Sequence, residues 1–186
     1  MNEKRFFGVS RRRAIKRLVV NNRQRLYRMA YAWTSDPHLA DDLVQQATYK
    51  ALINQKQLRD MAAAEAWLFR ILANCLTDHR RAKREFLSPD ELELVDKKTP
   101  EHATQEEQLV RRVRFAVQQL PFNQNQVVTL VDLEGFAYAT VAQILDIPVG
   151  TVMSRLCRGR RALKEHLLEI KPGETMEPAV KLKRIK

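Results

Sequence analysis

The sequence has few of the residues that build disulfide-bonded, metal-binding or membrane-spanning proteins. It contains only two cysteines, Cys75 and Cys157, and they form no CxxC pair, so neither a disulfide framework nor a zinc site is expected. We predict two buried thiols in a reducing compartment. No apolar run approaches the roughly 20 residues that cross a bilayer, and no apolar segment follows the basic N-terminus as in a signal peptide. These absences predict a cytoplasmic protein without membrane insertion.

Glycine and alternating β-branched residues are also scarce, which argues against an all-β fold. The chain of 186 residues has five glycines, while 45% of its residues are hydrophobic. That apolar content is enough to build a core, and its spacing is mostly helical. We therefore expect an all-α protein of two small domains. The formal net charge of +11 attracts polyanions, which points to nucleic acid or an anionic membrane face.

Charge and proline divide the chain into segments. The first thirty or so residues are basic, whereas Ser88 to Gln108 is acidic and contains Pro89 and Pro100, a composition typical of a linker. We predict a basic N-terminal extension over residues 1–10, a helical domain over 11–86, an acidic linker over 87–108, a helix-turn-helix domain over 109–169 and a basic tail over 170–186.

Three helices are expected in the first domain, over residues 11–34, 38–55 and 63–84. Ser35, Asp36 and Pro37 interrupt the apolar pattern and form the cap of the second helix. In the second domain, a short helix over 138–145 precedes Asp146, a residue that tolerates the left-handed conformation of a tight turn. A longer helix over 149–168 follows. This pattern predicts a helix-turn-helix whose second helix enters the major groove.

The outward face of that second helix is polar and basic. Four side chains fall at spacings that place them on one side, namely Thr151, Ser154, Arg155 and Arg158, with Arg160 and Arg161 beside them. Arginine bonds guanine bidentately and also binds phosphate. The alternative is a solvated basic face on an ordinary helical hairpin.

Several motifs resemble a known family. The run PVGTVMSRLCRGR at 148–160, preceded by QLP at 119–121 and LEGF at 133–136, resembles region 4 of the extracytoplasmic-function (ECF) sigma factors of the sigma-70 family. In the first domain, DLVQ at 42–45 and AWLFRILAN at 66–74 resemble region 2 of the same family. The resemblance covers residues 11–168 in the order that the family has.

The resemblance implies a sigma factor that binds RNA polymerase core and directs it to promoters, and it implies a role for three rows of residues. The row on the last helix would read the −35 element as duplex: Thr151, Ser154, Arg155, Arg158 and Arg160. A row on the third helix would open and read the −10 element: Arg70, Asn74, Thr77, Asp78 and Arg81. A row on the second helix would bind core polymerase: Asp41, Asp42, Gln45, Gln46 and Tyr49.

The partners implied are the clamp helices of the largest polymerase subunit, the flap of the second subunit, promoter DNA and an anti-sigma factor. No cofactor, metal or catalytic residue is expected. The linker either follows the path of template or nascent RNA, or is a plain tether. The chain departs from the family pattern at Gln46, Thr48 and Asp146, where Glu, an aromatic residue and Gly are usual.

Three other classes of protein remain as alternatives. A stand-alone helix-turn-helix regulator would bind a two-fold symmetric site, but it leaves the polar face of the third helix unexplained. A serine recombinase would need a catalytic βα domain, which the sequence does not contain, and the four histidines are scattered without triad or ligand spacing. A membrane-surface helix over residues 4–20 is weakly supported.

Overall fold

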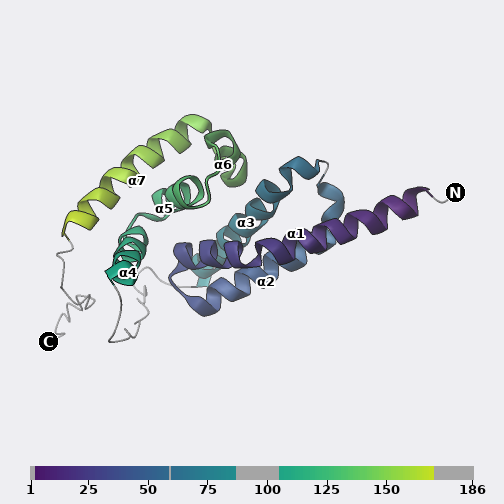
Figure 1. Ribbon diagram of the computed structural model, residues 1–186, viewed down its shortest axis with the longest axis horizontal. Helices are drawn as coiled ribbons and strands as arrows, with labels where there is room; N and C mark the ends of the chain where they lie inside the picture. The colour runs from purple at the N-terminus through teal and green to yellow at the C-terminus, as the bar shows by residue number, and fades with distance from the viewer. Residues whose placement is uncertain (1–2, 59, 87–104, 170–186) are drawn as a thin grey trace.

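The computed structural model describes residues 3–58, 60–86 and 105–169, and the regular structure in those ranges is entirely helical (Figure 1). The helices α1 to α3 form the first domain and α4 to α7 the second. Their bounds are α1 Glu3–Thr34, α2 Pro37–Ile53, α3 Ala64–Phe86, α4 Gln105–Gln118, α5 Phe122–Val128, α6 Tyr138–Leu145 and α7 Val149–Glu169. The all-α prediction is confirmed for this part of the chain.

The first domain begins with α1, which starts at Glu3 and extends beyond the other helices at its N-terminal end (Figure 1). A tight turn then reverses the chain. Ser35 has a positive φ of 58°, and the Asp36 carboxylate accepts hydrogen bonds from the backbone N–H of His38 and Leu39, with Pro37 in the first helical turn. This is the predicted cap. It sets α2 against α1, where side chains such as Leu26 and Leu43 are fully buried.

The second domain contains the predicted helix-turn-helix, formed by α6 and α7. Asp146 ends α6 with φ 55° and ψ 50°, in the left-handed region, as expected. Val141, Val152 and Leu156 fill the space between the two helices and are buried. Gly159 on α7 allows a close approach to α5, since a β-carbon there would lie 2.6 Å from Cγ2 of Val128.

One element was not anticipated from the sequence. The helix α5 continues into a π-helical turn over Thr129–Leu133, in which the N–H of Glu134 donates to the carbonyl of Thr129 at 3.1 Å. Gly135, with φ 74°, then ends the helix. A π-helical turn shifts the side chains that follow it around the helix axis.

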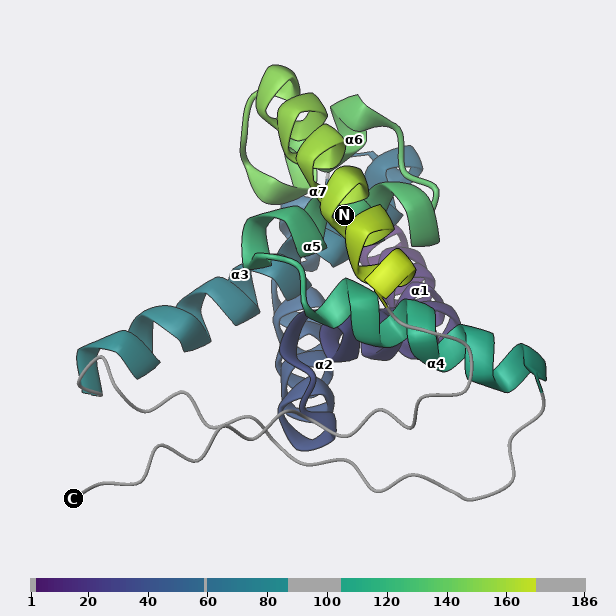
Figure 2. The same ribbon diagram turned by 90° about the vertical axis from the view of Figure 1, so that its left-hand side faces the viewer.

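The two domains pack against each other. The helix α3 contacts α6, and α1 contacts both α4 and α5. Figure 2 shows α4 crossing in front of α1, with α6 and α7 lying above both helices. Their buried apolar side chains form a single hydrophobic cluster that includes Phe69 of the first domain and Leu130 of the second.

The prediction that both cysteines are buried is half wrong. Cys75 is 1% exposed, but Cys157 is exposed. Each helical residue is rotated by about 100° from its neighbour, so Cys157 turns away from the core that buries Leu156 and lies on the side of the exposed Met153. The acidic segment up to residue 104 and the basic tail lie outside the described residues. Within the described ranges, no helix is both long and apolar enough to span a membrane.

Candidate nucleic-acid and polymerase interfaces

The row predicted to read duplex DNA lies on the outer face of α7. Ser154 and Arg158 are exposed, while Thr151 and Arg155 are half-buried. The Ser154 hydroxyl donates to the Thr151 carbonyl at 3.1 Å, and Nε of Arg158 donates to the Ser154 carbonyl at 3.2 Å. Since α7 buries Val152 on its opposite face, the row is the surface that this helix-turn-helix presents outward.

Arg160 has a different environment from the rest of the row. Its guanidinium forms an ion pair with Asp132, with Nε donating to Oδ2 at 3.1 Å. The hydrogen bond to this carboxylate is the main cause that raises the pKa of Arg160, against the opposing effect of desolvation. Arg160 is therefore held toward α5 and the π-helical turn in the free protein.

The row predicted to read the −10 element is exposed along one side of α3. All five of its members are exposed, Arg70, Asn74, Thr77, Asp78 and Arg81. The Thr77 hydroxyl donates to the carbonyl of Ala73 at 3.0 Å, and Asp78 forms an ion pair with Lys50 of α2 at 3.1 Å. Asn74 has its amide at the surface, where it can meet a base edge.

The row predicted to bind core polymerase lies on α2. Asp42, Gln45, Gln46 and Tyr49 are exposed, and Tyr49 is 65% exposed. Asp41 is half-buried, lies 3.5 Å from Arg23 and accepts a hydrogen bond from the Gln45 amide at 3.0 Å. The buried side of α2 packs in the core, so this row is the free face of the helix.

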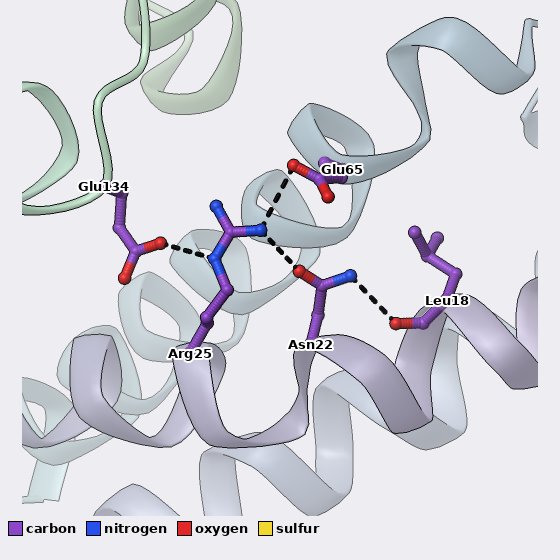
Figure 3. Close-up of polar contacts among 5 residues, drawn as sticks. All are labelled: Leu18, Asn22, Arg25, Glu65 and Glu134. Atoms are coloured by element: carbon purple, nitrogen blue, oxygen red, sulfur yellow. Dashed lines mark hydrogen bonds and ion pairs between the residues drawn. The ribbon is translucent and has the colours of Figure 1, made fainter.

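A cluster around Arg25 joins the two domains, and sequence reasoning did not find it (Figure 3). Nε of Arg25 donates to Oε2 of Glu134 in the second domain at 2.7 Å. In the first domain, its Nη1 lies 2.8 Å from Oδ1 of Asn22 and 3.2 Å from Oε2 of Glu65. The Glu134 side chain is only 6% exposed, so the pair between domains is well shielded from water.

The charge of Arg25 is stabilised by this cluster. Burial by itself lowers the pKa of Arg25, but the hydrogen bonds and charges of Glu134 and Glu65 outweigh it, and the net shift is upward. The guanidinium also lies over the Phe69 ring, 5.4 Å from its centroid. Arg25 is thus held by acidic side chains from both domains at once.

Two further hydrogen bonds cross the same boundary, one of them buried and the other partly buried. The indole N–H of Trp33 donates to Oγ1 of Thr129 at 2.8 Å, and the amide of Asn125 donates to the carbonyl of Ala32 at 2.9 Å. Each connects α1 to α5 or to the π-helical turn that follows it. The sequence shows Asn125 and Thr129 only as polar residues within a helical segment, and their burial is known from the structure alone.

The helix α3 also meets the second domain through three further contacts. The Phe69 and Phe136 rings pack edge to face with centroids 5.0 Å apart. Arg80 lies over the ring of Phe122 at 3.7 Å. Arg70, a member of the −10 row, pairs with Asp146 in the turn of the helix-turn-helix at 3.7 Å. These contacts bring the −10 row close to the helix-turn-helix.

The fold and the exposed rows define a class of protein. It is a two-domain helical DNA-binding protein, with a basic helix-turn-helix at one end and exposed polar rows on two helices of the other domain. Over the same ranges, no three His, Cys, Asp or Glu side chains are placed to hold a metal ion.

Comparisons with known proteins identify the family. The family model for Sigma-70 region 2 matches residues 18–86, and the model for Sigma-70, region 4 matches residues 111–163. The chain is 30% identical to the RNA polymerase sigma-H factor of Pseudomonas aeruginosa over 169 residues, which are 84% of this chain and 87% of that protein. It is 32% identical to the ECF RNA polymerase sigma factor SigM of Mycobacterium tuberculosis over 163 residues, which are 87% of this chain and 81% of that protein.

A solved structure is also similar over both domains. The sigma factor RpoE in complex with the anti-sigma factor NepR, from Bartonella quintana, is 28% identical, with a TM-score of 0.70 that covers 84% of this chain and 98% of that chain. The chain belongs to the ECF sigma factors of the sigma-70 family.

Proposed function

We propose that this protein binds RNA polymerase core and directs it to promoters, with the second domain reading the −35 element and the first domain recognising and opening the −10 element. The observation that carries the proposal is the pair of exposed polar rows on α3 and α7, in a chain that belongs to the sigma family. A stand-alone regulator would use the α7 row but gives the α3 row no role. Promoter selection requires binding and strand opening, so we assign no enzymatic reaction.

Reading of the −35 element would rest on the arginines of α7. A guanidinium in the major groove can donate two hydrogen bonds to O6 and N7 of guanine. Arg155 and Arg158 are the members of the row suited to this contact, and Thr151 and Ser154 can donate to bases or phosphates. Arg160 would contribute only after leaving Asp132.

Opening of the −10 element would rest on α3. A base that leaves the duplex stack needs a polar group for its edge and an apolar or aromatic wall for its face. Asn74 is exposed and carries an amide that can both donate and accept, so we assign it to a base edge. Arg70 is suited to phosphate. Trp67 packs partly buried against the core, which suits a supporting role better than a stacking one.

Docking on core polymerase would use the α2 row, with the exposed Tyr49 at its C-terminal end, and the second domain would bind the flap of the second subunit. Gln46 and Thr48 stand where the family usually has Glu and an aromatic residue, so this surface has one acidic group fewer. We propose an anti-sigma factor as a further partner, supported by the similar sigma factor found in complex with one. Because polymerase and chromosome lie in the bacterial cytoplasm, the protein would act there.

The first experiment is co-migration of the full chain with bacterial core RNA polymerase on a sizing column at raised salt. Salt screens the loose attraction of a protein with net charge +11 for an acidic enzyme. We expect a stable one-to-one complex that initiates transcription from a promoter. Failure to form it, with tight binding to a palindromic duplex instead, would establish the stand-alone regulator.

The role of Asn74 is tested by Asn74→Ala, with Lys83→Ala as the control because Lys83 is exposed on the same helix outside the row. We expect Asn74→Ala to impair promoter opening, followed by permanganate footprinting, more than duplex binding by the holoenzyme. An equal loss at both steps would contradict the assignment to a flipped base.

A further inference from the structure

The outward face of α7 carries apolar side chains that the predicted row does not include. Val152 and Leu156 are buried, whereas the residues that directly follow them, Met153 and Cys157, are exposed, Met153 by 54%. Successive helical residues are rotated by about 100°, so Met153 and Cys157 lie one turn apart on the same side of the helix. We call these two residues the apolar strip. The face that α7 turns away from the core is therefore apolar as well as polar.

The apolar strip lies directly beside the polar residues assigned to DNA reading. Ser154 and Arg158 follow Met153 and Cys157 in the chain and are both exposed. All four belong to the first half of α7, which begins at Val149, and the N-terminal residues of a recognition helix are those that contact base edges. The helix runs along the outer edge of the second domain (Figure 1). A major groove that receives Ser154 and Arg158 therefore also receives the apolar strip.

An exposed thioether has few favourable partners in a DNA groove. The methionine side chain has no hydrogen-bond donor, and its sulfur is only a weak acceptor, so it does not replace the water that it displaces from polar base edges. The C5-methyl group of thymine is the apolar group that the major groove displays. Contact between the Met153 side chain and this methyl group removes both from water, which is favourable. The chemistry of the strip thus matches thymine.

We propose that Met153, with Cys157 beside it, is a specificity-determining residue that selects thymine in the −35 element. This inference rests on the proposed function and deepens it, because Arg158 would select guanine in the same element. Positions 153 and 158 are five residues apart, which is about 7.5 Å of helix rise and about two steps of roughly 3.4 Å along a DNA strand. The preferred element would therefore hold a thymine within about three base pairs of a guanine.

The experiment removes single methyl groups from the DNA. Holoenzyme assembled from the full chain and core RNA polymerase first selects promoter duplexes from a pool that is randomised over the −35 element. Each thymine of the selected element is then replaced, one at a time, by deoxyuridine, which lacks the C5-methyl group and keeps the same base pairing. The affinity of the holoenzyme is measured for each duplex, so that any loss reports the contact with one methyl group.

We expect the wild type to bind about fourfold more weakly when the contacted thymine becomes deoxyuridine, which is the effect of one buried methyl-sized group. Met153→Ala should bind the two duplexes equally. Met153→Leu should keep most of the difference, because leucine is apolar and of similar volume. Leu168→Ala is the matched control and should keep all of it, since Leu168 is an exposed apolar residue at the opposite end of α7.

The results separate this inference from the proposed function. If the wild type selects a −35 element but binds thymine and deoxyuridine equally at every position, the role of Met153 is refuted and the proposed function stands. The same conclusion follows if Met153→Ala keeps the fourfold difference. If the holoenzyme selects no −35 element at all, the proposed function fails, and the assignment of Met153 fails with it.

Discussion

At the scale of single residues, the exposure and bonding partners of a side chain decide what its substitution measures. Arg158 is exposed, and within the described part of the chain its side chain donates a hydrogen bond to the carbonyl of Ser154 in its own helix, so removing it leaves no buried group behind. Arg160 is bound to Asp132, and removing it frees a carboxylate. The two arginines belong to the same predicted row. Of the two, substitution of Arg158 tests DNA reading alone, whereas substitution of Arg160 also removes the partner of Asp132.

Arg158→Ala and Arg155→Ala are expected to weaken binding of the holoenzyme to its −35 element by about 1–3 kcal/mol each, if both guanidinium groups reach base edges. The measurement is a competition between promoters that differ only in the −35 element. Lys164→Ala is the control, because Lys164 is exposed on the same helix but lies beyond the row. Unchanged promoter preference in both arginine variants would remove them from the reading surface.

The two thiols should differ strongly in reactivity. Burial is the largest cause that raises the pKa of Cys75, so little thiolate forms at neutral pH, whereas Cys157 is exposed. We expect a thiol reagent to modify the exposed Cys157 within the mixing time. The buried Cys75 should react only as fast as the protein unfolds. Cys157→Ala should abolish the fast phase. Two fast phases in the folded wild type would contradict the burial of Cys75.

At the scale of elements, close contacts between helices depend on a few small or conformationally tolerant residues. Asp146 adopts the left-handed conformation in the turn of the helix-turn-helix, and Gly135 does so after the π-helical turn. Gly159 serves another purpose, because its missing β-carbon lets α7 lie against the Val128 side chain of α5. The second domain is therefore expected to be sensitive to added side-chain volume at Gly159 of α7 and tolerant of it at Gly150.

Gly159→Ala is expected to destabilise the protein by about 1–3 kcal/mol, because the new methyl group would overpack against the buried, β-branched Val128. Gly150→Ala is the matched control: nothing lies within 4 Å of its β-carbon position, so it should stabilise α7 by about 0.5–1 kcal/mol. Urea unfolding followed by circular dichroism measures both. Equal effects of the two alanines would show that α7 does not approach α5 this closely in solution.

At the scale of the whole molecule, the two domains are coupled by contacts between residues distant in sequence. Trp33 and Thr129 are 96 residues apart, and Arg25 and Glu134 are 109 apart. These pairs link the unfolding of one domain to that of the other, and they bring the two predicted reading rows together.

A double-mutant cycle at Trp33 and Thr129 measures this coupling. Thr129→Val should lower the free energy of unfolding by about 1–3 kcal/mol, because the buried indole N–H loses its acceptor. In a chain that also carries Trp33→Phe, there is no indole N–H to leave unpaired, so Thr129→Val should lower the free energy of unfolding by less. We expect a coupling energy of about 0.5–1.5 kcal/mol between the two positions. Purely additive effects in urea unfolding would mean that the bond between the domains does not form in solution.

The sequence alone determined the helical class, the helix-turn-helix and the helix faces that carry the three polar rows. These features follow from local rules: the Asp36 and Pro37 cap, the left-handed Asp146, and an apolar period that separates the buried Val152 from the exposed Ser154. The motifs of the two domains also led to the sigma family. Which row contacts which part of the promoter or the polymerase stays a prediction from that family.

Only the tertiary structure decided how the domains meet. Helical periodicity indicates that a face is buried but not which distant face covers it, so nothing in the sequence indicated that Glu134 would bind Arg25 or that Arg70 would reach Asp146. The π-helical turn at Thr129–Leu133 has no periodic signature over so few residues. The exposure of Cys157 likewise depends on what packs against α7, because burial is a property of the assembled molecule rather than of a residue type.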